Sequence, residues 1–138
     1  MPSLRPSGFT LLEILMAVAL VAIVSAVALP RFIDFRSDAR SAVTTDRMAS
    51  LRAGLGRYVN HMSAAPAALS DLVTKGTQAN YDPINKIGWS GPYVDGTVSG
   101  WNLDGWGTAY QYTAATKTLR SCGANKTCGD ADDLVVTF

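Results

Sequence analysis

The sequence has few of the residues on which most enzymes and nucleic-acid-binding proteins depend. Its 138 residues include one histidine and two cysteines, and Lys+Arg number 12 against 11 Asp+Glu. A single histidine leaves no Ser-His-Asp arrangement, and no glycine-rich phosphate loop is present, so we do not expect an enzyme. A net charge of +1 gives no reason to expect a nucleic-acid partner. No repeat or low-complexity segment occurs.

What the chain does have is a long apolar run near its start. Between Phe9 and Leu29 only Thr10, Glu13 and Ser25 are polar, and the run contains no Lys or Arg. A helix of this length rises about 31 Å at about 1.5 Å per residue, which matches a bilayer hydrocarbon core of about 30 Å. The run therefore predicts a membrane-spanning helix.

Three kinds of segment have this composition. One is a secretory signal peptide, cleaved after Ala26-Val27-Ala28. The second is a plain membrane anchor, and the third is a leader that is cut before the apolar run. Signal-peptide cores are shorter, about 7 to 15 residues, and rarely carry a carboxylate in their first turn. A plain anchor gains nothing from Glu13, so the third interpretation is favoured.

Glu13 is an acid without an obvious partner. A charged side chain at the centre of a bilayer helix costs roughly 2.5 to 3.5 kcal/mol on insertion scales. No Lys or Arg lies between Glu13 and Arg31. Its partner must come from a chain end, from the membrane interface or from another molecule.

The stretch Gly8-Phe9-Thr10-Leu11-Leu12-Glu13 resembles the class III signal of type IV pilins and type II secretion pseudopilins. The resemblance implies a prepilin peptidase that cuts after Gly8 and N-methylates Phe9. It also implies that Glu13 sets register in a fibre by meeting the Phe9 amine of a neighbouring subunit. The alternative is a Glu13 that pairs with its own N-terminus or reaches the headgroups. Pro30 falls where the family often has proline, and a helix bend is expected there.

The rest of the chain predicts an α+β fold. Apolar residues at steps of three and four continue the helix to about His61. A short helix, turn-rich loops and three strands should follow. The expected division is a cleaved leader at 1–8, a membrane or filament-core helix at 9–29, its amphipathic half at 30–61 and a head at 62–138. The short helix is expected at 67–73, the loops at 76–107, and the strands at 108–112, 118–122 and 134–138.

Five aromatic residues lie in the predicted loop region. We interpret them as anchors that hold the loop on the core, and the alternative is a carbohydrate or peptide groove. They are Tyr81, Trp89, Tyr93, Trp101 and Trp106.

A second resemblance covers most of the chain. Gly91-Pro92-Tyr93 and Asp104-Gly105-Trp106-Gly107-Thr108-Ala109-Tyr110-Gln111-Tyr112 are similar to segments of the major pseudopilin of type II secretion systems. The resemblance implies a pilin-like fold with a small antiparallel sheet, and a subunit that waits in the inner membrane with a periplasmic head. It implies self-assembly into a helical fibre, with an assembly platform, other pseudopilins and the lipid bilayer as partners. The alternative is a type IV pilin or minor pilin of a surface fibre.

The C-terminal loop contains a pair of cysteines and a group of side chains that could bind a metal ion. With an export signal, Cys122 and Cys128 are expected to form a disulfide, and zinc would need more ligands than they offer. In the family, this loop binds calcium. The resemblance places Asn125, which replaces a family Asp, and Asp133 at ligand positions, with Asp130 and Asp132 as spare oxygen donors, and the candidate ligands are Asn125, Asp130 and Asp133. The alternative is that the Cys122–Cys128 pair clamps the loop in place of calcium and that the aspartates form a solvated acidic turn. No other cofactor is expected.

Overall fold

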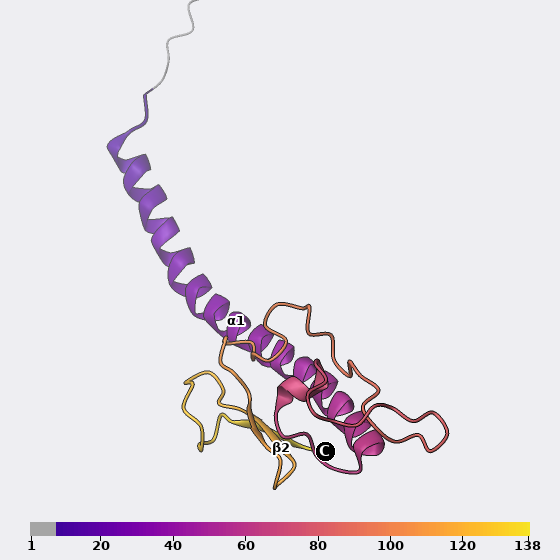
Figure 1. Ribbon diagram of the computed structural model, residues 1–138. Coiled ribbons are helices and arrows are strands. Elements are labelled where there is room, and N and C mark those ends of the chain that lie inside the picture. The colour runs from indigo at the N-terminus through magenta and orange to yellow at the C-terminus, as the bar shows by residue number, and fades with distance from the viewer. Residues whose placement is uncertain (1–7) are drawn as a thin grey trace, which may run out of the picture. The chain divides into compact units, whose positions relative to one another are not determined.

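A computed structural model describes residues 8–138, apart from the side chains of Leu29, Pro30 and Ile33. Residues 1–7 of the predicted leader therefore lie outside the described residues. The chain divides into two compact units, Met1–Arg36 and Ser37–Phe138. The elements, shown in Figure 1, are α1 (Leu11–Met62), the 3-10 helix η1 (Leu69–Leu72), β1 (Gln111–Thr113), β2 (Thr118–Ser121) and β3 (Leu134–Thr137).

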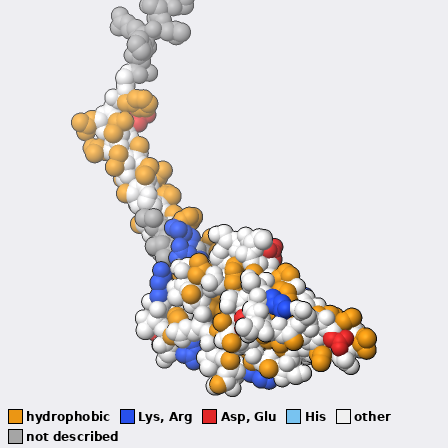
Figure 2. Space-filling model, viewed as in Figure 1, with side chains coloured by type: hydrophobic (Ala, Val, Ile, Leu, Met, Phe, Trp, Pro, Cys, Tyr) orange, Lys and Arg blue, Asp and Glu red, His pale blue; other side chains and the backbone are white. Residues whose placement is uncertain are grey.

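The described residues of the first unit include the apolar part of α1. Its segment Leu11–Ala28 has a mean hydropathy of 2.6, and none of it is buried within the chain. Hydrophobic side chains cover this segment in Figure 2. By length and composition it is suited to cross a membrane, which would remove these side chains from water.

The helix assignment of α1 continues through position 30. The Pro30 side chain lies outside the described part of the chain, so the bend expected at Pro30 stays a prediction.

The second unit is built on one face of α1. Buried residues recur along this face at steps of three and four, which is the spacing of one side of a helix. They contact a buried leucine from η1, a tyrosine from each of two loops and a leucine from the central strand. Full burial of one such side chain stabilises the fold by about 1.5 to 3 kcal/mol. The cluster comprises Met48, Leu51, Leu55, Tyr58, Leu72, Tyr93, Tyr110 and Leu119.

Gly54 lets a loop approach α1 closely. A Cβ at this position would lie 2.6 Å from Val94 Cγ2 and 3.2 Å from the Tyr93 carbonyl oxygen. The guanidinium of Arg57, one turn further along α1, donates a hydrogen bond to the same carbonyl. Glycine in a helix interior usually weakens the helix, and Gly54 would be expected to do so. The structure shows that its missing side chain makes room for the loop.

The three strands form one antiparallel sheet in the order β1-β2-β3. Leu119 in the central strand pairs with Tyr112 on one side and Val136 on the other. The ring of Tyr112 stacks on Phe138, and its hydroxyl donates to the Pro66 carbonyl at 2.8 Å. Burial raises the pKa of Tyr112 to about 12. The C-terminal residues are thus held on the sheet.

Three of the five aromatic residues in the loop region, Trp89, Tyr93 and Trp101, pack on the core as expected, whereas Tyr81 is exposed. The Trp89 indole N–H donates to the Asp71 carbonyl at 2.8 Å, and Tyr93 is 3% exposed. The Tyr93 hydroxyl accepts from the Ser90 N–H at 2.9 Å and lies 3.1 Å from His61 Nδ1. The one histidine is therefore part of the packing that holds this loop to the end of α1.

Two expected elements differ in detail from the structure. The short helix is a four-residue 3-10 turn rather than a helix over 67–73. The first strand begins at Gln111 rather than at residue 108. The reason is visible for the strand: the Thr108 N–H donates to the Asp104 carboxylate at 2.8 Å, so this backbone group is not available to a neighbouring strand.

Cys122 and Cys128 form the expected disulfide. Replacing both with serine is expected to lower the free energy of unfolding by about 2 kcal/mol, because the link restricts a short loop in the unfolded chain. Urea denaturation with and without reductant measures the effect. Reductant should destabilise the natural protein and leave the double serine variant unchanged. Equal sensitivity of both proteins to reductant would contradict the prediction.

Candidate functional site

The predicted cleavage position lies just outside a helix. Gly8, Phe9 and Thr10 are not helical and are exposed, and α1 begins at Leu11. The exposed fraction of Phe9 is 80%, and within residues 8–138 no atom other than those of Gly8 and its chain neighbour lies within 4 Å of where a Cβ on Gly8 would stand. A peptide bond in such a segment is accessible without unwinding of the helix. This geometry suits the expected cut between Gly8 and Phe9.

Glu13 lies in the first turn of α1, with its side chain exposed. Its backbone N–H donates to Thr10 Oγ1 at 3.2 Å, so Thr10 is the N-cap residue and Glu13 the third helical residue. A carboxylate here also interacts favourably with the helix dipole. Sequence reasoning missed this capping, although Ser/Thr followed three residues later by Glu is a known helix-start pattern.

Asp104 organises the loop before the sheet. This side chain is 2% exposed. Its Oδ1 accepts from the Trp106 N–H at 2.9 Å and the Thr108 N–H at 2.8 Å. Its Oδ2 accepts from the Ser121 hydroxyl of β2 at 2.7 Å. The Asp104 carboxylate, at the start of the segment 104–112, therefore joins this loop to the sheet. Burial, and after it the charge of Asp104, raises the pKa of Tyr110 to about 12.

The same loop is also joined to α1. The Gly105 N–H donates to Thr44 Oγ1 at 2.8 Å, and Arg47 donates to the Leu103 carbonyl at 2.9 Å. A Cβ at Gly105 would lie 2.2 Å from the Arg40 carbonyl oxygen, so only glycine fits this approach. The sequence identified Gly105 as part of a resemblance but did not reveal its packing role. No local pattern reveals a partner about sixty residues away.

Three carboxylates meet in the C-terminal loop. Oxygen atoms of Asp130, Asp132 and Asp133 lie within 4.8 Å of one another. Asp133 has 6% of its side chain exposed, and its Oδ2 pairs with Arg120 at 3.3 Å and accepts from the Gly129 N–H at 2.7 Å. Its Oδ1 is buried and, within residues 8–138, has no hydrogen-bond partner.

Asn125 is oriented differently from the expected calcium ligand. Its amide nitrogen donates to Asp130 at 2.6 Å and to Asp132 at 2.9 Å. Its amide oxygen accepts from the Thr127 N–H at 2.6 Å. Asp132, named only as a spare donor, belongs to the carboxylate cluster. A hydrogen bond with Asp130, and after it the Asn125 N–H, lowers the pKa of Asp132.

Together, an exposed apolar helix that continues into a small antiparallel head, and an acid in its first turn, define a pilin-like subunit. Residues 4–29 match the prokaryotic N-terminal methylation motif. Residues 31–136 match the family described as type II secretion system (T2SS), protein G. The chain belongs to this protein G family.

A characterised relative agrees with this assignment. The chain is 32% identical over 136 residues to the type II secretion system core protein G of Pseudomonas aeruginosa. The match covers 94% of this chain and 91% of that protein. No solved structure was found to match the chain.

Proposed function

We propose that the chain is a structural subunit of a type II secretion pseudopilus, a helical fibre that helps to move folded proteins across the outer membrane. The observation that carries the proposal is the pair of matches in one chain, a methylation motif followed by protein G over residues 31–136. The second match favours a pseudopilus over a surface pilus. A structural role also accounts for a head whose polar networks join loops to helix and sheet.

Deletion of the gene tests this function directly. Loss of exoprotein export with normal twitching motility is the expected result, and the natural gene should restore export. Loss of motility with normal export would instead identify a surface pilin, the alternative from the sequence.

Before assembly, the subunit crosses the inner membrane once. The segment Leu11–Ala28 supports this placement by its length and composition. The head, with the Cys122–Cys128 disulfide, lies in the periplasm, where an oxidising environment maintains such a link. A prepilin peptidase cuts after Gly8 and methylates Phe9, and an assembly platform and other pseudopilins are the remaining partners.

In the fibre, Glu13 pairs with the Phe9 amine of a neighbouring copy. Cleavage creates this amine, which is largely cationic near neutral pH. Glu13 lies in the first turn of an apolar helix and Phe9 lies two residues before that helix begins, and an unpaired charge is costly in such an apolar setting. Mutual neutralisation therefore favours the assembled state and specifies the axial register. The Thr10 cap holds the helix start, and with it Glu13, in a defined conformation.

We also propose that the C-terminal loop binds a calcium ion. Calcium takes six to eight oxygen ligands, and the loop offers three carboxylates close together. The buried Oδ1 of Asp133 has no partner among the described residues, as expected of an atom that awaits a cation. Asp130, Asp132 and Asp133 would hold the ion, and Asn125 would join them after its amide group turns. The ion would neutralise the clustered charge and order the loop.

Calcium is expected to raise the melting temperature of the protein, and chelator should reverse the rise. Asp130→Asn removes an exposed ligand and should abolish most of the response. Asp95→Asn is the matched control, because Asp95 is also an exposed loop acid and lies outside the cluster. A melting temperature that does not respond to calcium would dismiss the site.

A further inference from the structure

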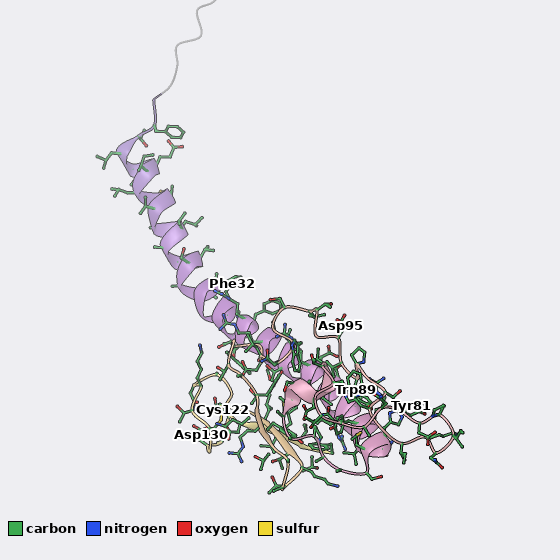
Figure 3. All side chains as sticks on the ribbon, viewed as in Figure 1. Phe32, Tyr81, Trp89, Asp95, Cys122 and Asp130 are labelled. Atoms are coloured by element: carbon green, nitrogen blue, oxygen red, sulfur yellow. A yellow bond between two sulfur atoms is a disulfide. The ribbon has the colours of Figure 1, made fainter. Side chains whose placement is uncertain are left out.

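A group of cationic and aromatic side chains follows the membrane-length segment. Arg31 and Arg36 are exposed. Phe32 and Phe35 have exposed fractions of 61% and 70%. Figure 2 shows Lys and Arg atoms next to the apolar helix at this end, and Figure 3 labels Phe32 there. We call these four residues the basic aromatic belt. Two exposed phenylalanines on a charged helical turn need a partner.

The belt lies at the height of lipid headgroups. The apolar run ends at Leu29, so Arg31 and Arg36 lie about 3 and 10.5 Å beyond it at about 1.5 Å per residue. The headgroup region adds roughly 5 to 8 Å on each side of the hydrocarbon core. Arginine side chains are long enough to reach the phosphate layer from both positions. The phenylalanine rings are apolar and gain by leaving water on the hydrocarbon side of the same boundary.

In the mature chain, basic side chains flank the membrane-length segment at its C-terminal end only. No Lys or Arg lies between Phe9 and Pro30, and the proposed cleavage after Gly8 removes Arg5. In the mature chain the belt therefore carries the basic side chains closest to the bilayer. Asp34 lies between the arginines and is also exposed, so the segment has a net charge of +1 (two Arg minus one Asp). With so small an excess, both arginines are needed for attraction to an anionic surface.

We infer that the basic aromatic belt binds anionic phospholipid headgroups while the subunit waits in the membrane. Arg31 and Arg36 donate hydrogen bonds to lipid phosphate, which matches the planar guanidinium. Phe32 and Phe35 lie at the boundary of the hydrocarbon core. The contact defines the depth of the subunit in the membrane and must be released when the subunit enters the fibre. The inference rests on the proposed membrane anchoring.

Native mass spectrometry of the full mature chain, released from nanodiscs, tests the binding. The nanodiscs contain phosphatidylcholine and phosphatidylglycerol, which differ in headgroup charge. We expect the chain to retain phosphatidylglycerol preferentially. Each Arg→Gln change at 31 or 36 should reduce that retention about fivefold, the effect of one basic residue at an anionic surface. The double Arg→Lys variant keeps the charge and should retain an intermediate amount.

Arg52→Gln is the matched control, because Arg52 is an exposed arginine of the same helix and its loss changes the net charge equally. Equal retention of both lipids, or an equal loss in Arg52→Gln, would overturn the inference. A cross-linking experiment between copies gives a further test. Belt variants that lose cross-linking while their lipid retention is unchanged would also overturn the inference, because the belt would then contact another subunit rather than lipid. Circular dichroism should show unchanged helix content in every variant. Release of the natural protein by alkaline carbonate would instead contradict the membrane anchoring itself.

Discussion

Replacing Glu13 with valine is expected to leave the protein in the membrane and to prevent its entry into the fibre. The substitution makes Leu11–Ala28 more apolar, so insertion should not suffer. In the fibre, however, it would leave the Phe9 amine of a neighbouring copy without its carboxylate. Breaking a buried ion pair by removing one partner costs about 3 to 5 kcal/mol. Membrane fractionation and electron microscopy of sheared fibres measure the two effects.

Two further variants separate pairing from other roles of the first turn. Asp34→Asn also removes an exposed acid from α1 but lies outside the apolar segment, and it should assemble normally. Thr10→Ala removes the N-cap and should weaken the helix start by only about 1 kcal/mol. Fibres of normal abundance from Glu13→Val would refute the pairing. An assembly defect in Thr10→Ala as severe as in Glu13→Val would show that capping is the main role of this turn.

Replacing Asp104 with alanine is expected to destabilise the head by about 3 kcal/mol or more. The change leaves the Ser121 hydroxyl and the N–H groups of Trp106 and Thr108 without their acceptor. A buried donor left unpaired costs about 1 to 3 kcal/mol. Urea denaturation of the mature chain in detergent, followed by tryptophan fluorescence, gives the change in unfolding free energy.

Asp95→Ala is the matched control for this prediction. The Asp95 carboxylate also accepts from a nearby backbone N–H and hydroxyl, both of Thr97, but it is exposed. Water replaces lost partners at an exposed site, so the cost should stay below about 1 kcal/mol. Equal destabilisation by the two changes would show that burial of Asp104 is not the cause.

The N-terminal part of the molecule could be predicted well because its signals are local. The apolar run, the acid at Glu13 and the Gly8-Phe9 pair are all read within thirty residues of the sequence. The apolar residues at steps of three and four that predict the helix also coincide with the buried face of α1 between Met48 and Tyr58, although Phe32 and Phe35 at the same spacing are exposed. Such patterns follow from helix geometry alone, so they do not depend on which elements meet in the folded head.

The head was predicted less completely because its contacts connect distant residues. Helix propensity alone makes Gly54 a destabilising residue. Only the close approach of the loop carrying Tyr93 explains why a glycine is needed there. Asn125 resembled a calcium ligand, but its amide nitrogen points to the carboxylates. Local sequence does not specify such orientations, which depend on the partners that tertiary packing supplies.

The sequence by itself determined the membrane-length helix and the cysteine pair through composition and spacing, and it indicated the class of leader and the pilin-like order of elements through a resemblance carried by short motifs. Only the tertiary structure decided that Asp104 and Gly105 join loop, helix and sheet, and that Asp132 joins the acidic cluster. The role of Asp104 and Gly105 depends on burial and on contacts across about sixty residues of the chain. The role of Asp132 depends on the course of the C-terminal loop. Neither kind of contact can be predicted from the sequence of neighbouring residues.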